Sequence, residues 1–253
     1  MVKFNNDDFF IVTGANSGIG KSIALKISEL GGTVIAVGRN IENLNKLKED
    51  SNYGKNIHIE VKDLVEDVES IDKWFTELKN RFGKFRGMVL SAGLLDIIPI
   101  NALSLKKAKS LFDINYFVNL YMCKYFSDNR NNVGEGASIV VLSSIASIKG
   151  DVGIINYSAS KGAINSMVKS MAVEFSKKKI RVNSVLPGFV LTEMIDKWKN
   201  VYTDEYIESM NTKYPLGIGK PEYIADTVCF LLSDSAKWIT GQNISVDGGA
   251  SIA

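Results

Sequence analysis

Residues 9–20 read FFIVTGANSGIG, a short apolar run that leads directly into three glycines and then into a helical pattern. Each glycine has a physical reason at a strand-to-helix turn. Gly14 permits the tight turn, Gly18 lets a ligand approach the backbone without a Cβ in the way, and Gly20 lets the helix pack closely on the strand. The free amides and the dipole at the helix N-terminus then suit a pyrophosphate. The stretch therefore predicts a dinucleotide-binding turn.

Short apolar runs and amphipathic stretches alternate along the rest of the chain. The predicted strands are rich in Val, Ile, Leu or Phe, as strands buried on both faces should be, and span residues 9–13, 33–37, 57–61, 87–90, 138–142, 180–185 and 243–246. The predicted helices span residues 17–30, 41–48, 68–82, 103–126, 157–176 and 221–232. This alternation predicts an α/β fold, a Rossmann-like doubly wound parallel sheet of seven strands with helices on both faces. We expect a single domain over residues 1–253.

One long interruption runs over residues 191–220, between the sixth predicted strand and the next clear helix. Inserts of this size are usually functional or mobile. We interpret the segment as a substrate lid; a helical hairpin packed on a neighbouring element is the alternative.

Composition excludes several classes of function. The 253 residues carry 30 basic and 28 acidic side chains, a net charge of +2 that gives no electrostatic case for nucleic acid. No apolar window is long enough for a membrane span, and the first residues lack a signal-peptide core, so we expect a cytoplasmic protein. Cys123, Cys229 and the single histidine, His58, lie far apart in the sequence. Neither a disulfide framework nor a metal site is expected.

The end of the second predicted strand addresses the choice of cofactor. It reads Val37-Gly38-Arg39-Asn40, with no acidic residue beside the arginine. In dinucleotide-binding folds an acidic side chain here accepts hydrogen bonds from a free ribose 2′-hydroxyl, whereas arginine suits a 2′-phosphate. The residues therefore favour NADP(H) over NAD(H).

Tyr157 and Lys161 are the strongest candidates for proton chemistry. They are four residues apart on a predicted helix, so their side chains share one face. A free phenol has a pKa of about 10, and a nearby ammonium lowers it by favouring the phenolate. We therefore expect Lys161 to lower the pKa of Tyr157, so that the phenol can exchange a proton with a substrate oxygen near neutral pH.

Together these motifs resemble the short-chain dehydrogenase/reductase family in its single-domain form, over essentially the whole chain. TGANSGIG at residues 13–20 matches the family's TGxxxGxG, and Tyr157 with Lys161 matches its YxxxK. Ser144, rather than neighbouring Ser143, matches the catalytic serine thirteen residues before Tyr157. Asp247-Gly248-Gly249 looks like the usual closing segment.

The resemblance implies a set of site residues. The implied catalytic residues are Ser144, Tyr157, Lys161 and Asn115, with Asn115 holding a water that passes protons toward Lys161. The implied cofactor-binding residues are Gly14, Asn16, Ser17, Gly18, Ile19, Gly20, Arg39, Asn40, Asp63, Leu64, Ser91, Ala92, Gly93, Tyr157, Lys161, Pro187, Gly188, Val190 and Thr192. Loops near the pocket carry several apolar side chains that suggest apolar walls, with ordinary core residues as the alternative: Leu94, Leu95, Ile97, Ile98, Ile148, Ile154 and Ile155.

Two positions depart from the family pattern. The family's NNAG is here Leu90-Ser91-Ala92-Gly93, so we expect this strand end to be less firmly held. Ser17 stands where many NADP-using members carry a basic residue, which leaves Arg39 as the main reader of a 2′-phosphate.

The implied function is an NADP(H)-dependent oxidoreductase that acts on a carbonyl or secondary alcohol, with the tyrosine as general acid or base. A 3-oxoacyl carrier-protein reductase and a sugar or nucleotide-sugar reductase remain open as substrate classes. A non-catalytic dinucleotide-sensing scaffold is the rival from a different class. The resemblance also implies a homotetramer, or a homodimer, formed through the helices predicted at 103–126 and 157–176 and the last strand.

Overall fold

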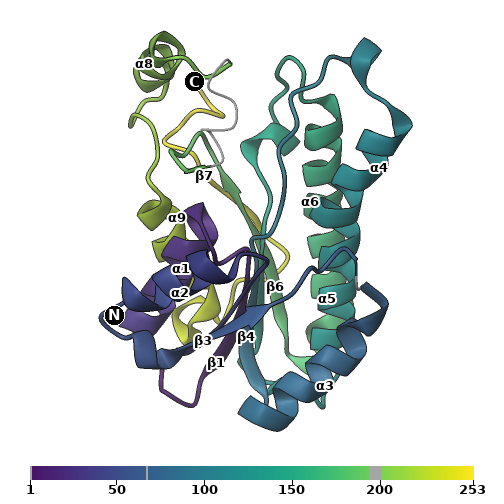
Figure 1. The fold of residues 1–253 in the computed structure, drawn as a ribbon, viewed down its shortest axis with the longest axis vertical. Coiled ribbons are helices and arrows are strands. Elements are labelled where there is room, and N and C mark those ends of the chain that lie inside the picture. Colours follow the sequence, from purple (N-terminus) through teal and green to yellow (C-terminus); the bar gives the residue numbers. More distant parts are fainter. Residues whose placement is uncertain (1, 67, 194–200) are drawn as a thin grey trace.

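The computed structural model describes residues 2–66, 68–193 and 201–253 of the chain (Figure 1). Seven parallel strands in this part form one sheet in the order β3-β2-β1-β4-β5-β6-β7. The strands are β1 Phe9–Thr13, β2 Thr33–Gly38, β3 Ile57–Val61, β4 Phe85–Leu90, β5 Ser138–Leu142, β6 Arg181–Pro187 and β7 Asn243–Val246. The predicted fold class, a doubly wound parallel α/β sheet, is confirmed.

Helices cover both faces of the sheet (Figure 1). The α-helices of the described residues are α1 Gly18–Glu29, α2 Ile41–Glu49, α3 Ile71–Phe82, α4 Leu105–Phe112, α5 Val118–Phe126, α6 Ile155–Phe175, α8 Asp204–Lys213 and α9 Pro221–Leu232. Strand order reverses at β1, because the chain runs outward to β3 and then returns to β4. Open sheets of this kind bind ligands at the carboxyl ends of the strands beside such a reversal.

Alternating side chains of each strand build two separate cores. In β1, Phe10 and Val12 face the layer of α1, α2 and α9, whereas Ile11 faces the layer of α3, α5 and α6. All three side chains are fully buried. Burial on both faces explains why the strands read as continuous apolar runs rather than as an alternating pattern.

One predicted helix is divided in the structure. The stretch predicted as a helix over 103–126 contains α4, a π-helical turn at Asp113–Phe117, and α5. Turns of this kind are rare and occur frequently at functional sites. The irregular turn carries Asn115, which is fully buried.

The segment predicted as a lid contains α8, which lies beside the C-terminus of the chain (Figure 1). Residues 194–200 of the same segment lie outside the described residues, and they include Asp196, Lys197, Trp198 and Lys199. No helix in the ranges described is both long enough and apolar enough to cross a membrane.

Candidate active site

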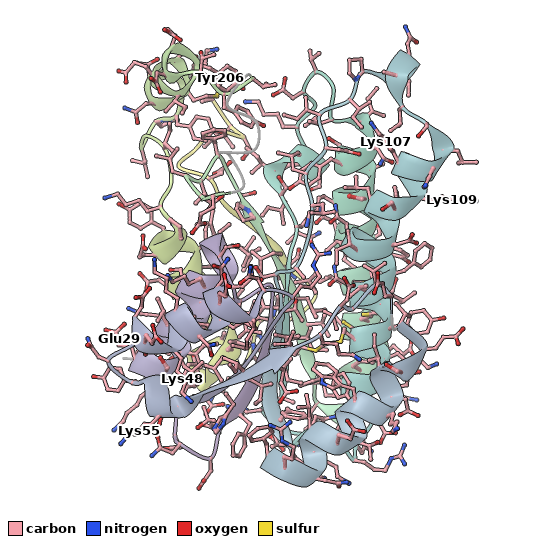
Figure 2. The ribbon with its side chains drawn as sticks, in the orientation of Figure 1. Glu29, Lys48, Lys55, Lys107, Lys109 and Tyr206 are labelled. Atoms are coloured by element: carbon pink, nitrogen blue, oxygen red, sulfur yellow. The ribbon has the colours of Figure 1, made fainter. Side chains whose placement is uncertain are left out.

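A cavity of about 1490 Å³ lies at the carboxyl ends of the strands. Its walls come from the turn between β1 and α1, the ends of β2, β4, β5 and β6, the start of α6, and α8. Segments that are far apart in the sequence therefore meet around one space. Tyr206 on α8, labelled in Figure 2, borders this space.

The glycine turn has the close contacts that the sequence predicts. A Cβ on Gly20 would lie 2.3 Å from the carbonyl oxygen of Gly14, and a Cβ on Gly14 would lie 2.9 Å from the backbone of Ala92. The amide of Gly18 donates a hydrogen bond of 2.8 Å to a carboxylate oxygen of Glu193. This end of α1 therefore accepts an anionic group, as the pyrophosphate of a dinucleotide requires.

Arg39 and Asp63 form an ion pair of 3.3 Å at the end of the cavity where the motifs predict the adenine ribose, called the ribose end below. The Asp63 carboxylate also accepts the amide of Val65 at 2.9 Å, and these hydrogen bonds hold its pKa below the ordinary value against the opposing effect of burial. Asn40 does not border the cavity, because its side chain accepts the amide of Asn43 and caps α2.

Several polar residues at this end were not predicted as site residues. Asn43, Lys46 and Lys62 line the cavity together with Arg39. Asn43 and Lys46 lie on α2 one helical turn apart, facing the ribose end, and a helical projection from the predicted start of this helix could have indicated them.

The end of β4 is held by hydrogen bonds to Thr13 and Asn115. The Thr13 hydroxyl accepts hydrogen bonds of 3.1 Å from the amides of both Ser91 and Ala92. Asn115 pairs with both backbone groups of Leu94, at 2.8 and 3.0 Å. Thr13 and Asn115 thus supply hydrogen bonds at this strand end, where the sequence lacks the two asparagines of the family pattern.

Tyr157 and Ser144 meet at the floor of the cavity. They come from the start of α6 and the loop after β5, and the Ser144 side chain acts on the Tyr157 phenol as a hydrogen-bonding neighbour. Burial raises the pKa of Tyr157 above its usual range, and the bond with Ser144 acts in the opposite direction. Tyr157 is therefore protonated at neutral pH and suited to donate a proton.

Lys161 is buried behind this pair. Its ammonium donates a hydrogen bond of 2.8 Å to the carbonyl of Leu142 and lies 5.8 Å from the centre of the Tyr157 ring. Burial lowers the pKa of Lys161 to about 8. The expected lowering of the Tyr157 pKa by Lys161 is not seen in this structure, because Lys161 points to the end of β5 and desolvation of the phenolate dominates.

Asn115 does not border the cavity either. Its amide is fully buried and bonds to Leu94 and to the hydroxyl of Ser160. The other predicted site residues line the cavity, namely Gly14, Asn16, Ser17, Gly18, Ile19, Gly20, Leu64, Ser91, Ala92, Gly93, Pro187, Gly188, Val190 and Thr192, with the residues already placed above.

An aromatic cluster borders the far end of the cavity. Phe189 and Tyr202 meet edge to face at 5.2 Å between ring centres, and Tyr202 lies 5.5 Å from Tyr206. Burial is the main cause that raises the pKa of Tyr202 to about 12, and the negative charge of Asp151 acts in the same direction. Of the expected apolar walls, Leu94, Leu95, Ile97 and Ile154 line the cavity, whereas Ile98, Ile148 and Ile155 do not.

Comparison with known proteins agrees with the geometry. Residues 14–251 match the family model described as Enoyl-(Acyl carrier protein) reductase. The chain is 34% identical over 249 residues to the 3-oxoacyl-[acyl-carrier-protein] reductase FabG of Thermotoga maritima, covering 94% of this chain and 96% of that one. The corresponding reductase of Aquifex aeolicus is 33% identical over 243 residues, covering 94% and 95%.

Solved structures extend the likeness over the whole fold. The crystal structure of a short-chain dehydrogenase/reductase from Brucella melitensis, described as a glucose/ribitol dehydrogenase, superposes with a TM-score of 0.89 at 30% identity and covers 100% of both chains. A gluconate 5-dehydrogenase from Beutenbergia cavernae, described as putative and solved with bound NADP, has a TM-score of 0.87 at 26% identity over 100% and 99%. The chain belongs to the short-chain dehydrogenase/reductase family of NAD(P)-dependent oxidoreductases.

Proposed function

We propose that this chain is an NADP(H)-dependent carbonyl reductase in which Tyr157 donates the proton to the substrate oxygen. The convergence of Tyr157, Ser144 and Lys161 on the cavity that the glycine turn also borders carries the proposal. When bound, the nicotinamide cofactor supplies the hydride. The protein supplies the proton, orients the substrate carbonyl and stabilises the charge that develops on its oxygen.

Each role follows from the chemistry of the side chain. The raised pKa of Tyr157 keeps its proton in place until an alkoxide forms. The Ser144 hydroxyl, beside Tyr157, hydrogen-bonds the same oxygen and acts as an oxyanion donor. Lys161 supplies positive charge behind the phenol and binds the nicotinamide ribose, and Asn115 fixes the end of β4 through Leu94.

The preference for NADP(H) is supported by Arg39. Its side chain is 70% exposed and pairs with Asp63 at 3.3 Å, so it can turn to a 2′-phosphate at little cost. Lys46 lies on the same side of the cavity and adds positive charge there. The bound NADP in the Beutenbergia cavernae protein is consistent with this choice.

Relatives over nearly the whole chain are named as 3-oxoacyl-[acyl-carrier-protein] reductases, which supports a 3-oxoacyl thioester as the substrate. The apolar wall of Leu94, Leu95 and Ile97 suits an acyl chain. A polyhydroxylated carbonyl is a second candidate. It is favoured by the aromatic faces of Phe189 and Tyr202 and by the Asp151 carboxylate at the same end of the cavity.

Further parts of the proposal concern the lid, assembly and location. Tyr206 and Met210 of α8 border the cavity, which supports a lid over the substrate.

Exposed apolar side chains on the helices expected to form the subunit interface, such as Leu105 and Val173, support a homotetramer or homodimer. The thiols of Cys123 and Cys229 are unpaired and buried, as in proteins of the reducing cytoplasm.

The test is consumption of NADPH in the presence of acetoacetyl-coenzyme A or of a panel of keto sugars. Turnover with the thioester alone supports the first substrate class, and turnover with a keto sugar alone supports the second. Binding of NADPH without turnover of any carbonyl would instead favour a dinucleotide-sensing scaffold.

A further inference from the structure

A chain of buried hydrogen bonds connects Tyr157 to the π-helical turn. The Ser160 hydroxyl donates to the backbone carbonyl of Tyr157 at 2.7 Å and accepts from the amide of Asn115 at 3.1 Å. Asn119 in turn donates to the backbone carbonyl of Asn115 at 2.7 Å. Ser160 and Asn115 are fully buried, and Asn119 is 1% exposed.

The orientation of Asn115 is fixed by its other contacts. Its Oδ1 accepts the amide of Leu94 at 2.8 Å, and its Nδ2 donates to the carbonyl of Leu94 at 3.0 Å. Turning the carboxamide over would face donor against donor and acceptor against acceptor. The second N–H of Nδ2 therefore points to the Ser160 hydroxyl oxygen. The hydroxyl of Ser160 in turn donates its hydrogen bond to the backbone carbonyl of Tyr157.

The geometry points to Ser160 as a positioning residue that holds the first turn of α6, and with it Tyr157, in register with Asn115 and the end of β4. The inference rests on the proposed role of Tyr157. Ser160 itself does not border the cavity, so it acts through Tyr157 and Asn115 rather than on the substrate.

Loss of the Ser160 hydroxyl has two consequences. It leaves one proton of Asn115 Nδ2 without its acceptor in a buried site, and it frees the carbonyl of Tyr157 from its side-chain donor. Both changes let the turn that carries Tyr157 move relative to Ser144. Misplacement of a catalytic group by about 1 Å can lower the rate by roughly a hundredfold.

The experiment compares Ser160→Ala with a matched control in the same turn of α6. The Ser158 hydroxyl is also buried but has no hydrogen-bond partner within the described residues, so Ser158→Ala removes the same atom without removing a bond. We expect kcat to fall by roughly ten- to a hundredfold in Ser160→Ala, with the Kd for NADPH within about twofold of wild type. In Ser158→Ala, kcat should stay within about twofold.

The pH profile separates positioning from simple loss of stability. The bond between Ser144 and Tyr157 lowers the pKa of Tyr157, so a displaced Tyr157 should move the alkaline limb of kcat to higher pH. The inference would be overturned if Ser160→Ala kept the alkaline limb of wild type and a kcat within about twofold of it. Equal losses of kcat in Ser160→Ala and Ser158→Ala would also overturn it.

Ser160→Cys serves if Ser160→Ala does not fold, because the thiol fills the space but is a weak hydrogen-bonding group. Its kcat should also fall, and wild-type kcat in this variant would overturn the inference. Absence of turnover in the wild type would count against the proposed function alone. Crystal structures of the wild type and of the Ser160 variant then test the positioning role. We expect a longer distance between the Tyr157 and Ser144 hydroxyls in the variant, and an unchanged distance would overturn the inference.

Discussion

Replacing Arg39 by alanine should remove the preference for NADPH while leaving the fold intact. The guanidinium is 70% exposed, and its ion pair with Asp63 contributes at most about 1 kcal/mol to stability. Asp63 stays in place without it, because the amides of Val65 and Glu66 also bind the carboxylate. The substitution therefore changes the charge at the ribose end of the cavity and little else.

The magnitude follows from the one contact that is lost. A charge-assisted hydrogen bond contributes about 1.5–3 kcal/mol when shielded, and the exposure of Arg39 places the value at the lower end. The Kd for NADPH should rise about tenfold, which corresponds to about 1.4 kcal/mol, whereas the Kd for NADH should stay unchanged.

The assay is a fluorescence titration of each protein with NADPH and NADH. Arg81→Ala is a matched control, because Arg81 is also exposed and also pairs with an acid, Glu60 on β3, but does not line the cavity. This control should leave both Kd values as in wild type. Equal affinity of the wild type for the two cofactors, or equal weakening of both by Arg39→Ala, would refute the reasoning.

Substitutions at two further positions test the supports of the site. Thr13→Val removes the acceptor of the Ser91 and Ala92 amides and should lower the free energy of unfolding by about 2–4 kcal/mol in urea, whereas Thr13→Ser should lower it by less than about 1 kcal/mol. The folded pKa of Lys161, about 8, lies below its unfolded value of about 10.4. The unfolded chain thus binds more protons between these values, so wild-type stability relative to Lys161→Met should rise by about 3 kcal/mol from about pH 8 to about pH 10.5. A flat difference between the two proteins across this window would contradict the lowering of the Lys161 pKa by burial.

Much of the fold can be predicted from local patterns. The strands at Phe9–Thr13, Ile57–Val61, Ser138–Leu142 and Asn243–Val246 have the predicted bounds, and so does the helix Pro221–Leu232. These are short apolar runs or amphipathic stretches bounded by glycine, proline or polar residues, so side-chain pattern and chain punctuation agree.

Other features depend on contacts between distant segments. The break in the helix predicted at 103–126 is accompanied by bonds from Asn115 to Leu94 and Ser160, which no periodicity within the helix indicates. The strand predicted at 180–185 extends to Pro187 because β7 pairs with β6 over its last four residues.

The motifs locate the site but do not specify its electrostatics. Spacing alone places Tyr157 and Lys161 on one helix face, yet the direction of each pKa depends on burial and on the partner each side chain finds. Lys161 bonds to the carbonyl of Leu142, a backbone group whose position follows only from the packing of α6 on β5. For the same reason the sequence does not indicate which backbone groups Thr13 and Ser160 bind.

The central claim is that Tyr157 donates the proton in an NADPH-dependent reduction. The most direct test is steady-state turnover of NADPH with the best carbonyl substrate, on wild type and Tyr157→Phe, together with the Kd of each protein for NADPH. We predict that the variant, which loses only a hydroxyl, binds NADPH within about twofold of wild type while kcat falls by roughly a hundred- to ten-thousandfold. A variant that keeps a tenth or more of wild-type kcat would contradict the account.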